Sequence, residues 1–146
     1  MINFGIDLGT TNSAIARFDS GKVYLYRNPI GQKDTLSSVV AYKNQRILVG
    51  EKARELLGKQ GEEVIGNFKR KMGTSDTFMV SAIDSSVSPV ELSAHVLKEL
   101  KSFVHDVESP SAAVITIPAS FDTLQANATK EAGYAAGFQQ IELLQE

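Results

Sequence analysis

The sequence predicts an α/β fold in which strands from both ends of the chain form a sheet flanked by helices. Three observations lead to this class. Residues 2–8 alternate apolar and polar side chains with the period of two of a half-buried strand. Residues 89–107 place apolar side chains on one continuous arc of a helix. Residues 112–117 are almost entirely apolar, as in a central strand that is covered on both faces.

The first strand leads into a tight turn that suits phosphate. Gly9 can adopt a positive φ and lets a ligand approach the backbone closely. The amides and hydroxyls of Thr10 and Thr11 would face into the turn and form a concavity for an anion. Asp7, at the end of the strand, is placed to hold a hydrated Mg²⁺, which prefers one or two carboxylates plus phosphate oxygens. The other interpretation is a hairpin whose turn is rich in Gly and Thr.

Two more antiparallel strands follow, around residues 14–16 and 23–26, before the breaker at residues 28–31. From residue 36 the pattern changes to short elements. We predict strands at 38–42 and 46–49, a short helix at 50–57, a helical turn at 67–72 and a peripheral strand within 77–83. Residues 36–88 are therefore expected to form an inserted, more polar subdomain with its own small core, while residues 1–35 and 89–146 form the main unit.

The longest predicted helix begins at Pro89, after a Ser88 cap and with Glu91 completing a capping box. It is expected to run up to Ser109-Pro110. Its buried arc is Leu92, Val96, Leu97, Leu100, Phe103, Val104 and Val107. His95 and His105 fall on the polar arc and do not share a face, which favours solvated histidines over metal ligands.

The chain after Pro118 predicts one more helix and one more strand. Asp122 is a suitable helix cap with Gln125 at the capping-box position, and Gly137 follows the last turn. The small residues on its predicted buried arc imply close approach to the sheet; the arc is Leu124, Ala128, Ala132, Ala135 and Ala136. A strand beginning at Ile141 has no element after it, which predicts a truncated fragment.

Composition excludes several classes of function. A net charge of −2 argues against a nucleic-acid-binding surface. The chain has no Cys, which excludes disulfides and thiolate chemistry and fits a reducing cytoplasm. No basic leader with an apolar segment and no apolar run of membrane-spanning length is present, so we expect no membrane association and a cytoplasmic protein.

Residues 7–13, Asp-Leu-Gly-Thr-Thr-Asn-Ser, resemble the first phosphate loop of the actin, sugar-kinase and heat-shock-chaperone ATPase superfamily, and most closely that of the DnaK-type seventy-kilodalton heat-shock chaperones. Residues 67–73, 113–121 and 128–133 resemble the same family, in its order and at its approximate spacing. The resemblance implies a ribonuclease-H-like mixed sheet flanked by helices. It also implies that the chain holds the first part of the ATPase lobe, without the second lobe or the peptide-binding domain.

The resemblance further implies ATP or ADP with Mg²⁺ as cofactors. Gly9, Thr10, Thr11 and Asn12 would bind the nucleotide phosphates, and Asp7 would hold the metal through water. Lys69 matches the family's catalytic lysine, which orients the attacking water and stabilises charge on the γ-phosphate. Glu146 matches its water- and metal-orienting glutamate. Apart from the resemblance, the residues alone favour Lys69 as a surface lysine beside Arg70 and Lys71.

Pro118 matches the proline that relays nucleotide state to the peptide-binding domain in the family. The partner arginine of that proline is Ala126 here, which puts the usual relay in doubt because alanine cannot form charge-assisted contacts. Lys71 also replaces an apolar residue of the family motif, so the chain resembles a divergent member.

The implied function is that of a stress-response, ATP-dependent chaperone fragment, inactive alone, whose parent binds unfolded peptides and co-chaperones through its missing parts. Two alternatives remain open at this point: a lobe of a sugar or acid kinase, and an actin-like nucleotide-dependent assembly protein. A third, non-enzymatic possibility is that the chain merely folds and associates with itself through an exposed lobe face.

Overall fold

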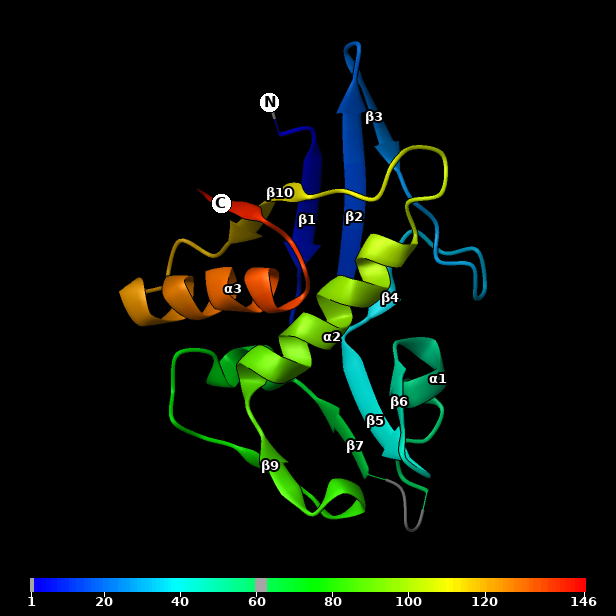
Figure 1. Cartoon of the computed structure of the whole chain (residues 1–146), viewed down its shortest axis with the longest axis vertical. Helices are drawn as coiled ribbons and strands as arrows, with labels where there is room; N and C mark the ends of the chain where they lie inside the picture. Colours follow the sequence, from blue (N-terminus) through cyan, green and yellow to red (C-terminus); the bar gives the residue numbers. More distant parts are fainter. Residues whose placement is uncertain (1, 60–62) are drawn as a thin grey trace.

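A computed structural model describes residues 2–59 and 63–146 of the chain. Its main sheet has the strand order β11-β10-β1-β2-β3, with β4 paired to β2 (Figure 1). The strands are β1 (Phe4–Leu8), β2 (Asn12–Asp19), β3 (Lys22–Leu25), β4 (Leu36–Ser37), β10 (Ala112–Ile117) and β11 (Gln140–Gln145). β1, β10 and β11 run parallel, whereas β2 is antiparallel to β1 and β3. The predicted mixed sheet is confirmed.

The strands of this sheet follow the period of two that the sequence predicts. In β1, Phe4, Ile6 and Leu8 are buried while Asp7 is exposed. β10 buries Ala113, Ile115 and Ile117 and leaves the alternate residues half-buried. The expectation that both faces of β10 are covered is wrong for the described residues, because α2 and α3 lie on the same side of the sheet (Figure 1).

The other face of the sheet is open. An apolar hollow of about 460 Å³ lies there, over β1, β2, β3, β10 and β11. Phe18, Leu25 and Leu144 line it and remain roughly half exposed. Folded domains normally cover an apolar face of this kind, whereas here it is open to solvent in the described part of the chain.

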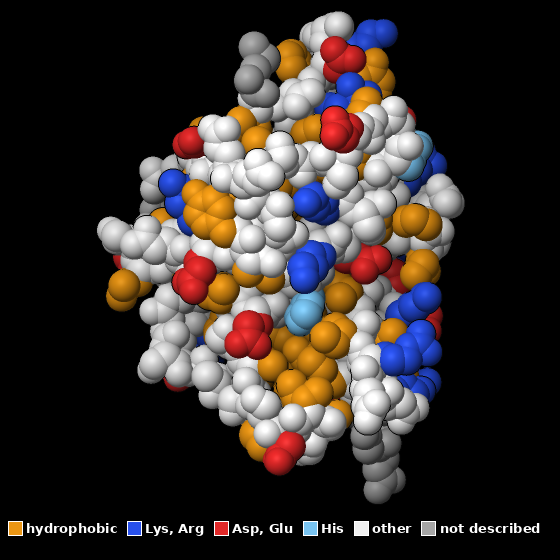
Figure 2. Space-filling view, viewed as in Figure 1, with side chains coloured by type: hydrophobic (Ala, Val, Ile, Leu, Met, Phe, Trp, Pro, Cys, Tyr) orange, Lys and Arg blue, Asp and Glu red, His pale blue; other side chains and the backbone are white. Residues whose placement is uncertain are grey.

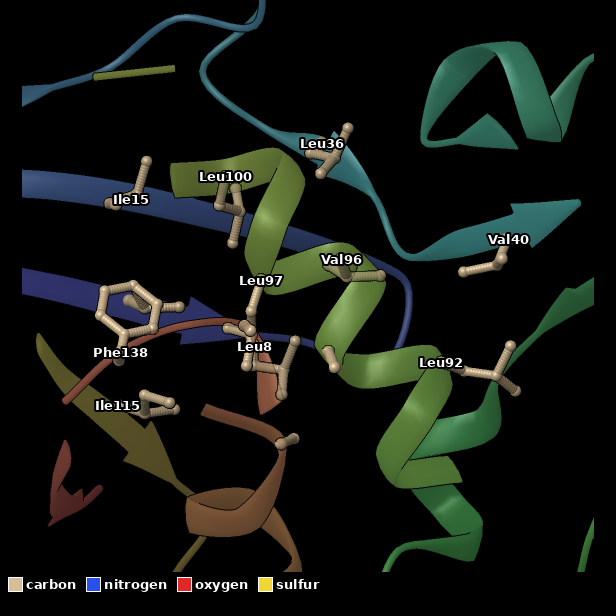
Figure 3. Close-up of a cluster of buried hydrophobic side chains, with 14 of the residues drawn as sticks. Leu8, Ile15, Leu36, Val40, Leu92, Val96, Leu97, Leu100, Ile115 and Phe138 are labelled. Carbon is tan, nitrogen blue, oxygen red and sulfur yellow. The ribbon is translucent and has the colours of Figure 1, made fainter. Parts of the chain in front are cut away.

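Helix α2 (Pro89–Ser102) is the centre of the main core. Ser88 accepts a hydrogen bond from the Glu91 amide through its hydroxyl, at 3.1 Å, as predicted for the cap. The Glu91 carboxylate does not return the second bond of a capping box. Figure 3 shows the apolar face of α2 turned toward side chains of β1, β2, β5 and β10; the four labelled α2 residues, Leu92, Val96, Leu97 and Leu100, are fully buried.

Three details of the α2 prediction are wrong. The helix ends at Ser102, not near Ser109, and Val107 is exposed. The loop after the helix is tied to the sheet, because the Asp106 carboxylate accepts hydrogen bonds from Tyr26 and Arg17. His95 is half-buried, not solvated, and burial lowers its pKa.

Helix α3 (Thr123–Ala135) has the predicted capping box, with both bonds formed between Asp122 and Gln125. Close approach to the sheet is also confirmed. A Cβ added at Gly133 would lie 2.6 Å from the Ile141 side chain. Leu124 and Ala135 are exposed, contrary to the prediction, because the buried stripe follows Ala128, Thr129, Ala132, Gly133 and Ala136 instead.

The segment between β4 and α2 forms two small sheets, in the order β6-β5-β7 and β8-β9. Its elements are β5 (Val39–Lys43), β6 (Arg46–Val49), α1 (Glu51–Arg54), β7 (Glu63–Gly66), the 3-10 helix η1 (Phe68–Lys71), β8 (Phe78–Val80), the 3-10 helix η2 (Ser81–Ile83) and β9 (Ser85–Val87). The two predicted strands around residue 44 are confirmed. The predicted helix at 50–57 is shorter, and only its first turn is α-helical.

Strand β5 divides the packing of this segment between two clusters. Val40 and Tyr42 point into the main core with α2, whereas Val39 and Ala41 pack against α1 in a second, small cluster. On the outside, Lys and Arg side chains gather over α1 and β6 (Figure 2). In the described part of the chain, no helix has the length and apolar character needed to cross a membrane.

Candidate functional site

The carboxyl ends of β1, β10 and β11 meet at one edge of the main sheet, since the three strands are parallel. Asp7 lies opposite Thr116, and Thr116 lies opposite Leu144. Glu146 follows directly, and its backbone amide donates a hydrogen bond of 2.9 Å to the Ile117 carbonyl. In open α/β sheets, ligands bind outside the carboxyl ends of the strands. The structure therefore brings Asp7 and Glu146 to the edge where a ligand is expected.

In the loop between β1 and β2, the backbone of Asn12 packs tightly against Gly9. Gly9 does not have the positive φ that we expected. Its lack of a side chain matters for another reason, because an added Cβ would lie 2.0 Å from the Asn12 carbonyl oxygen. Thr10 is half-buried, whereas Thr11 and Asn12 are exposed. The loop thus presents two of its polar residues to solvent beside the carboxyl edge.

Two serines that the sequence analysis did not single out hold this loop. The Ser13 hydroxyl accepts a hydrogen bond from the Gly9 amide at 3.2 Å, and it lies 2.8 Å from the Ser38 hydroxyl. The Ser38 amide donates to the Thr11 carbonyl at 2.8 Å. No sequence motif links residues so far apart, and only the position of Ser13 inside the loop motif could have drawn attention to it.

Lys69 reaches the same edge from η1. Phe68 and Met72 are buried on either side of it and anchor the 3-10 helix. Lys69 itself is half-buried, with its ammonium 5.5 Å from the centre of the Phe121 ring, in the loop after β10.

The charges near Lys69 include the two other residues predicted for catalysis and metal binding, Asp7 and Glu146. Burial lowers the pKa of Lys69, while the negative charges of Asp7 and Glu146 act in the opposite direction. Residues from three distant parts of the sequence therefore face one another closely enough to interact. A partly desolvated cation between two carboxylates is an arrangement found often at functional sites.

Within residues 2–59 and 63–146, no three His, Asp or Glu side chains come together to form a metal site. This does not conflict with the predicted magnesium, because Mg²⁺ keeps most of its waters and is held by one or two carboxylates plus substrate phosphates. Asp7 is exposed at the edge and Glu146 lies near it, as their shared effect on Lys69 indicates. These residues fit a hydrated ion that also contacts a phosphate.

Pro118 follows β10 at the same edge and is half-buried. Its carbonyl accepts a hydrogen bond from the Phe121 amide at 3.1 Å, so the loop that carries Phe121 begins at this proline. Ala126 lies in α3, where it is also half-buried.

The strand order, the parallel carboxyl ends and the glycine-threonine loop agree with the first lobe of the actin and Hsp70 fold. A family model described as Hsp70 protein matches residues 3–85 and 74–146. The chain belongs to the Hsp70 family. This confirms both the resemblance and the ribonuclease-H-like fold class, and it favours the chaperone branch over the kinase and actin-like branches.

Curated relatives agree with the family match. The chain is 42% identical, over 99% of its length, to the chaperone protein DnaK of Mesomycoplasma hyopneumoniae. It is 42% identical over 97% of its length to that of Thermosipho africanus and 38% identical over 97% to that of Metamycoplasma hominis. In each case it spans 24% of the relative's own length.

Proposed function

We propose that the chain supplies the first half of an Mg-ATP-hydrolysing cleft in a chaperone of the Hsp70 family. The observation that carries the proposal is that Asp7 and Glu146 lie at the carboxyl edge of the main sheet, and that Lys69 packs on the Phe121 ring in the loop after β10. Residues 1–35 and 89–146 would form the core ATPase unit, and residues 36–88 a peripheral insertion that contributes Lys69.

Each residue has a role that its position supports. Gly9 lets the phosphates approach the backbone, and Thr10, Thr11 and Asn12 offer amides and hydroxyls to the β- and γ-phosphates. Phosphoryl transfer depends mainly on positioning and charge neutralisation. Bound Mg²⁺, which Asp7 would hold through water, supplies part of that neutralisation.

Lys69 and Glu146 would act on the attacking water. The Lys69 ammonium can donate hydrogen bonds to that water and to the γ-phosphate, and the Glu146 carboxylate can accept one from the water. The Phe121 ring restricts where the Lys69 ammonium can lie. Restriction of the Lys69 ammonium before the nucleotide arrives would lower the reorganisation needed during reaction.

The partners of the whole protein follow from the relatives, which are named chaperone protein DnaK. We infer that unfolded peptides and co-chaperones bind parts of the protein outside this chain, and that Pro118 passes nucleotide state toward them. Ala126 in place of the relay arginine is expected to weaken this coupling. The absence of Cys from the sequence fits a cytoplasmic protein.

A second possibility, self-association, is favoured by one observation. The open face of the sheet exposes Phe18, Leu25 and Leu144 around a single apolar hollow. If the chain exists without a covering element, two copies would bury this surface together. Sedimentation of the isolated chain over a range of concentrations distinguishes a dimer from a monomer.

The test of the main proposal is calorimetric titration with Mg-ADP. The proteins compared are this chain alone and a chimaera in which it replaces the matching quarter of the Thermosipho africanus relative. We expect the chimaera to bind Mg-ADP and hydrolyse ATP, and the isolated chain, with half a cleft, to bind far more weakly. A chimaera that folds cooperatively but binds no nucleotide contradicts the proposal.

The role of Lys69 is tested in the same chimaera. Lys69→Met should lower turnover by about 10²–10³-fold with little change in Mg-ADP affinity, because its contribution is made mainly in the transition state. Lys71→Met is the matched control, since Lys71 is exposed and pairs with Asp76 at 3.3 Å. Equal effects of the two substitutions would show that Lys69 is a surface lysine.

A further inference from the structure

Ser38 and Ser13 form a buried polar contact between two segments that are distant in sequence. Their exposed fractions are 2% and 1%, and their hydroxyl oxygens are 2.8 Å apart. Buried hydroxyls need partners, and apolar residues of similar size would fill the space without this requirement. The pair is therefore explained better by what it holds in place than by packing alone.

The pair holds the phosphate loop at two points. The Ser13 hydroxyl accepts from the Gly9 amide, so it fixes the first residue of the loop. The Ser38 amide donates to the Thr11 carbonyl, so it fixes the third. Thr10 lies between these two points, and Thr11 is the second of them. Ser38 therefore constrains the backbone that would face the phosphates.

Ser38 is itself anchored in the segment that carries Lys69. The neighbouring Ser37 donates hydrogen bonds from its amide and its hydroxyl to the Glu51 carboxylate, at 2.7 and 2.8 Å. Glu51 is the first residue of α1. A hollow of about 220 Å³ beside the loop is lined by Thr10, Thr11 and Ser38 on one side and by Asn67, two residues before Lys69, on another.

We propose that Ser38 is a positioning residue that sets the phosphate loop relative to the segment bearing Lys69. The inference rests on the proposed function, in which this loop receives the phosphates of a nucleoside di- or triphosphate. Ser38 acts through Ser13 and through the backbone of Gly9 and Thr11.

The first experiment is amide hydrogen exchange on the chain itself, without nucleotide. Ser38→Ala should accelerate exchange at the Gly9 amide about three- to tenfold beyond the change at amides of α2 and β10, as expected for loss of one hydrogen bond. Ser93→Ala is the matched control: Ser93 is fully buried, and its hydroxyl donates a hydrogen bond of 3.5 Å to the Met72 sulfur. This control should change all amides by one common factor.

Ser13→Ala provides a second route if Ser38→Ala folds poorly, because it removes the same contact from the other side. It should accelerate exchange at the Gly9 amide at least as strongly. Acceleration of loop and core amides by the same factor in either serine variant would overturn the inference, since that result reports stability alone.

The second experiment separates this inference from the proposed function. In the chimaera, Ser38→Ala should weaken Mg-ADP binding about three- to tenfold, while Ser93→Ala leaves it unchanged. Unchanged binding in Ser38→Ala would overturn the inference while the ATPase assignment stands. A wild-type chimaera that binds no Mg-ADP would overturn the proposed function, and the exchange experiment would still decide whether Ser38 sets the loop.

Discussion

Gly9→Ala should destabilise the protein by about 1–3 kcal/mol, the usual range for overpacking a filled site. The added Cβ would lie 2.0 Å from the Asn12 carbonyl oxygen, whereas ordinary contact begins at 3.4 Å. The obstacle is backbone, so no change of side-chain rotamer relieves it. The loop must move by about 1.4 Å, the difference between these distances, and this displacement strains the Gly9–Ser13 hydrogen bond.

Gly5→Ala is the matched control, because Gly5 lies four residues earlier, in the strand β1 that leads into the loop. A Cβ added there meets no atom within 4 Å. Glycine within a strand costs conformational entropy, so Gly5→Ala should stabilise the protein by about 0.5–1 kcal/mol. The two substitutions are chemically identical and differ only in what surrounds the new methyl group.

Urea unfolding of the two variants and the wild type measures this contrast directly. The free energies of unfolding of Gly5→Ala and Gly9→Ala should differ by about 1.5–4 kcal/mol, the combined range of the two effects. Mg-ADP binding by the chimaera should be lost in Gly9→Ala and kept in Gly5→Ala. Equal stability of the two variants would refute the reasoning, because it would show that the loop yields freely.

Three further predictions concern stability. Glu51→Gln should cost about 1–3 kcal/mol in urea unfolding, because its carboxylate accepts three hydrogen bonds at the start of α1, whereas Glu55→Gln on the exposed side should change little. Gly133→Ala should cost about 1 kcal/mol in the same assay, since overpacking against the sheet exceeds the gain in helix propensity. The hydrogen bond from Tyr26 lowers the pKa of Asp106 below its ordinary value of 3.8, so the stabilisation that Asp106 gives is complete above that pH and is lost below it. Asp106→Asn should therefore be less stable than wild type at about pH 7, and the difference should shrink as the pH falls below 3.8 in urea titrations.

Features that depend on neighbouring residues could be predicted from the sequence. The capping box of α3 is an example, because Asp122 and Gln125 satisfy each other within one turn. The burial pattern of β1 is another, since the period of two is a property of the strand itself. The bounds of β10 also agree with the prediction residue for residue, because the apolar run itself marks the strand.

Features that depend on contacts between distant segments could not be predicted. The Ser13–Ser38 pair spans 25 residues, and the hydrogen bond from Tyr26 to Asp106 spans 80. Neither follows a period or a motif. The prediction for α2 continued too far because the apolar spacing extends to Val107, whereas the helix ends at Ser102 and Asp106 accepts the hydrogen bond from Tyr26. Likewise, the apolar character of β10 indicates burial but not which elements supply it.

The interpretation of Lys69 needs both its sequence neighbours and its position in the folded chain. The sequence places it in a basic run with Arg70 and Lys71, and the structure separates the three, since only Lys69 is half-buried. Burial lowers its pKa despite two nearby carboxylates, so the folded protein holds this ammonium less favourably than water does. An anionic ligand at the carboxyl edge would supply the counter-charge that Asp7 and Glu146 only partly provide, so the half-buried position of Lys69 beside the Phe121 ring fits the proposed phosphate site.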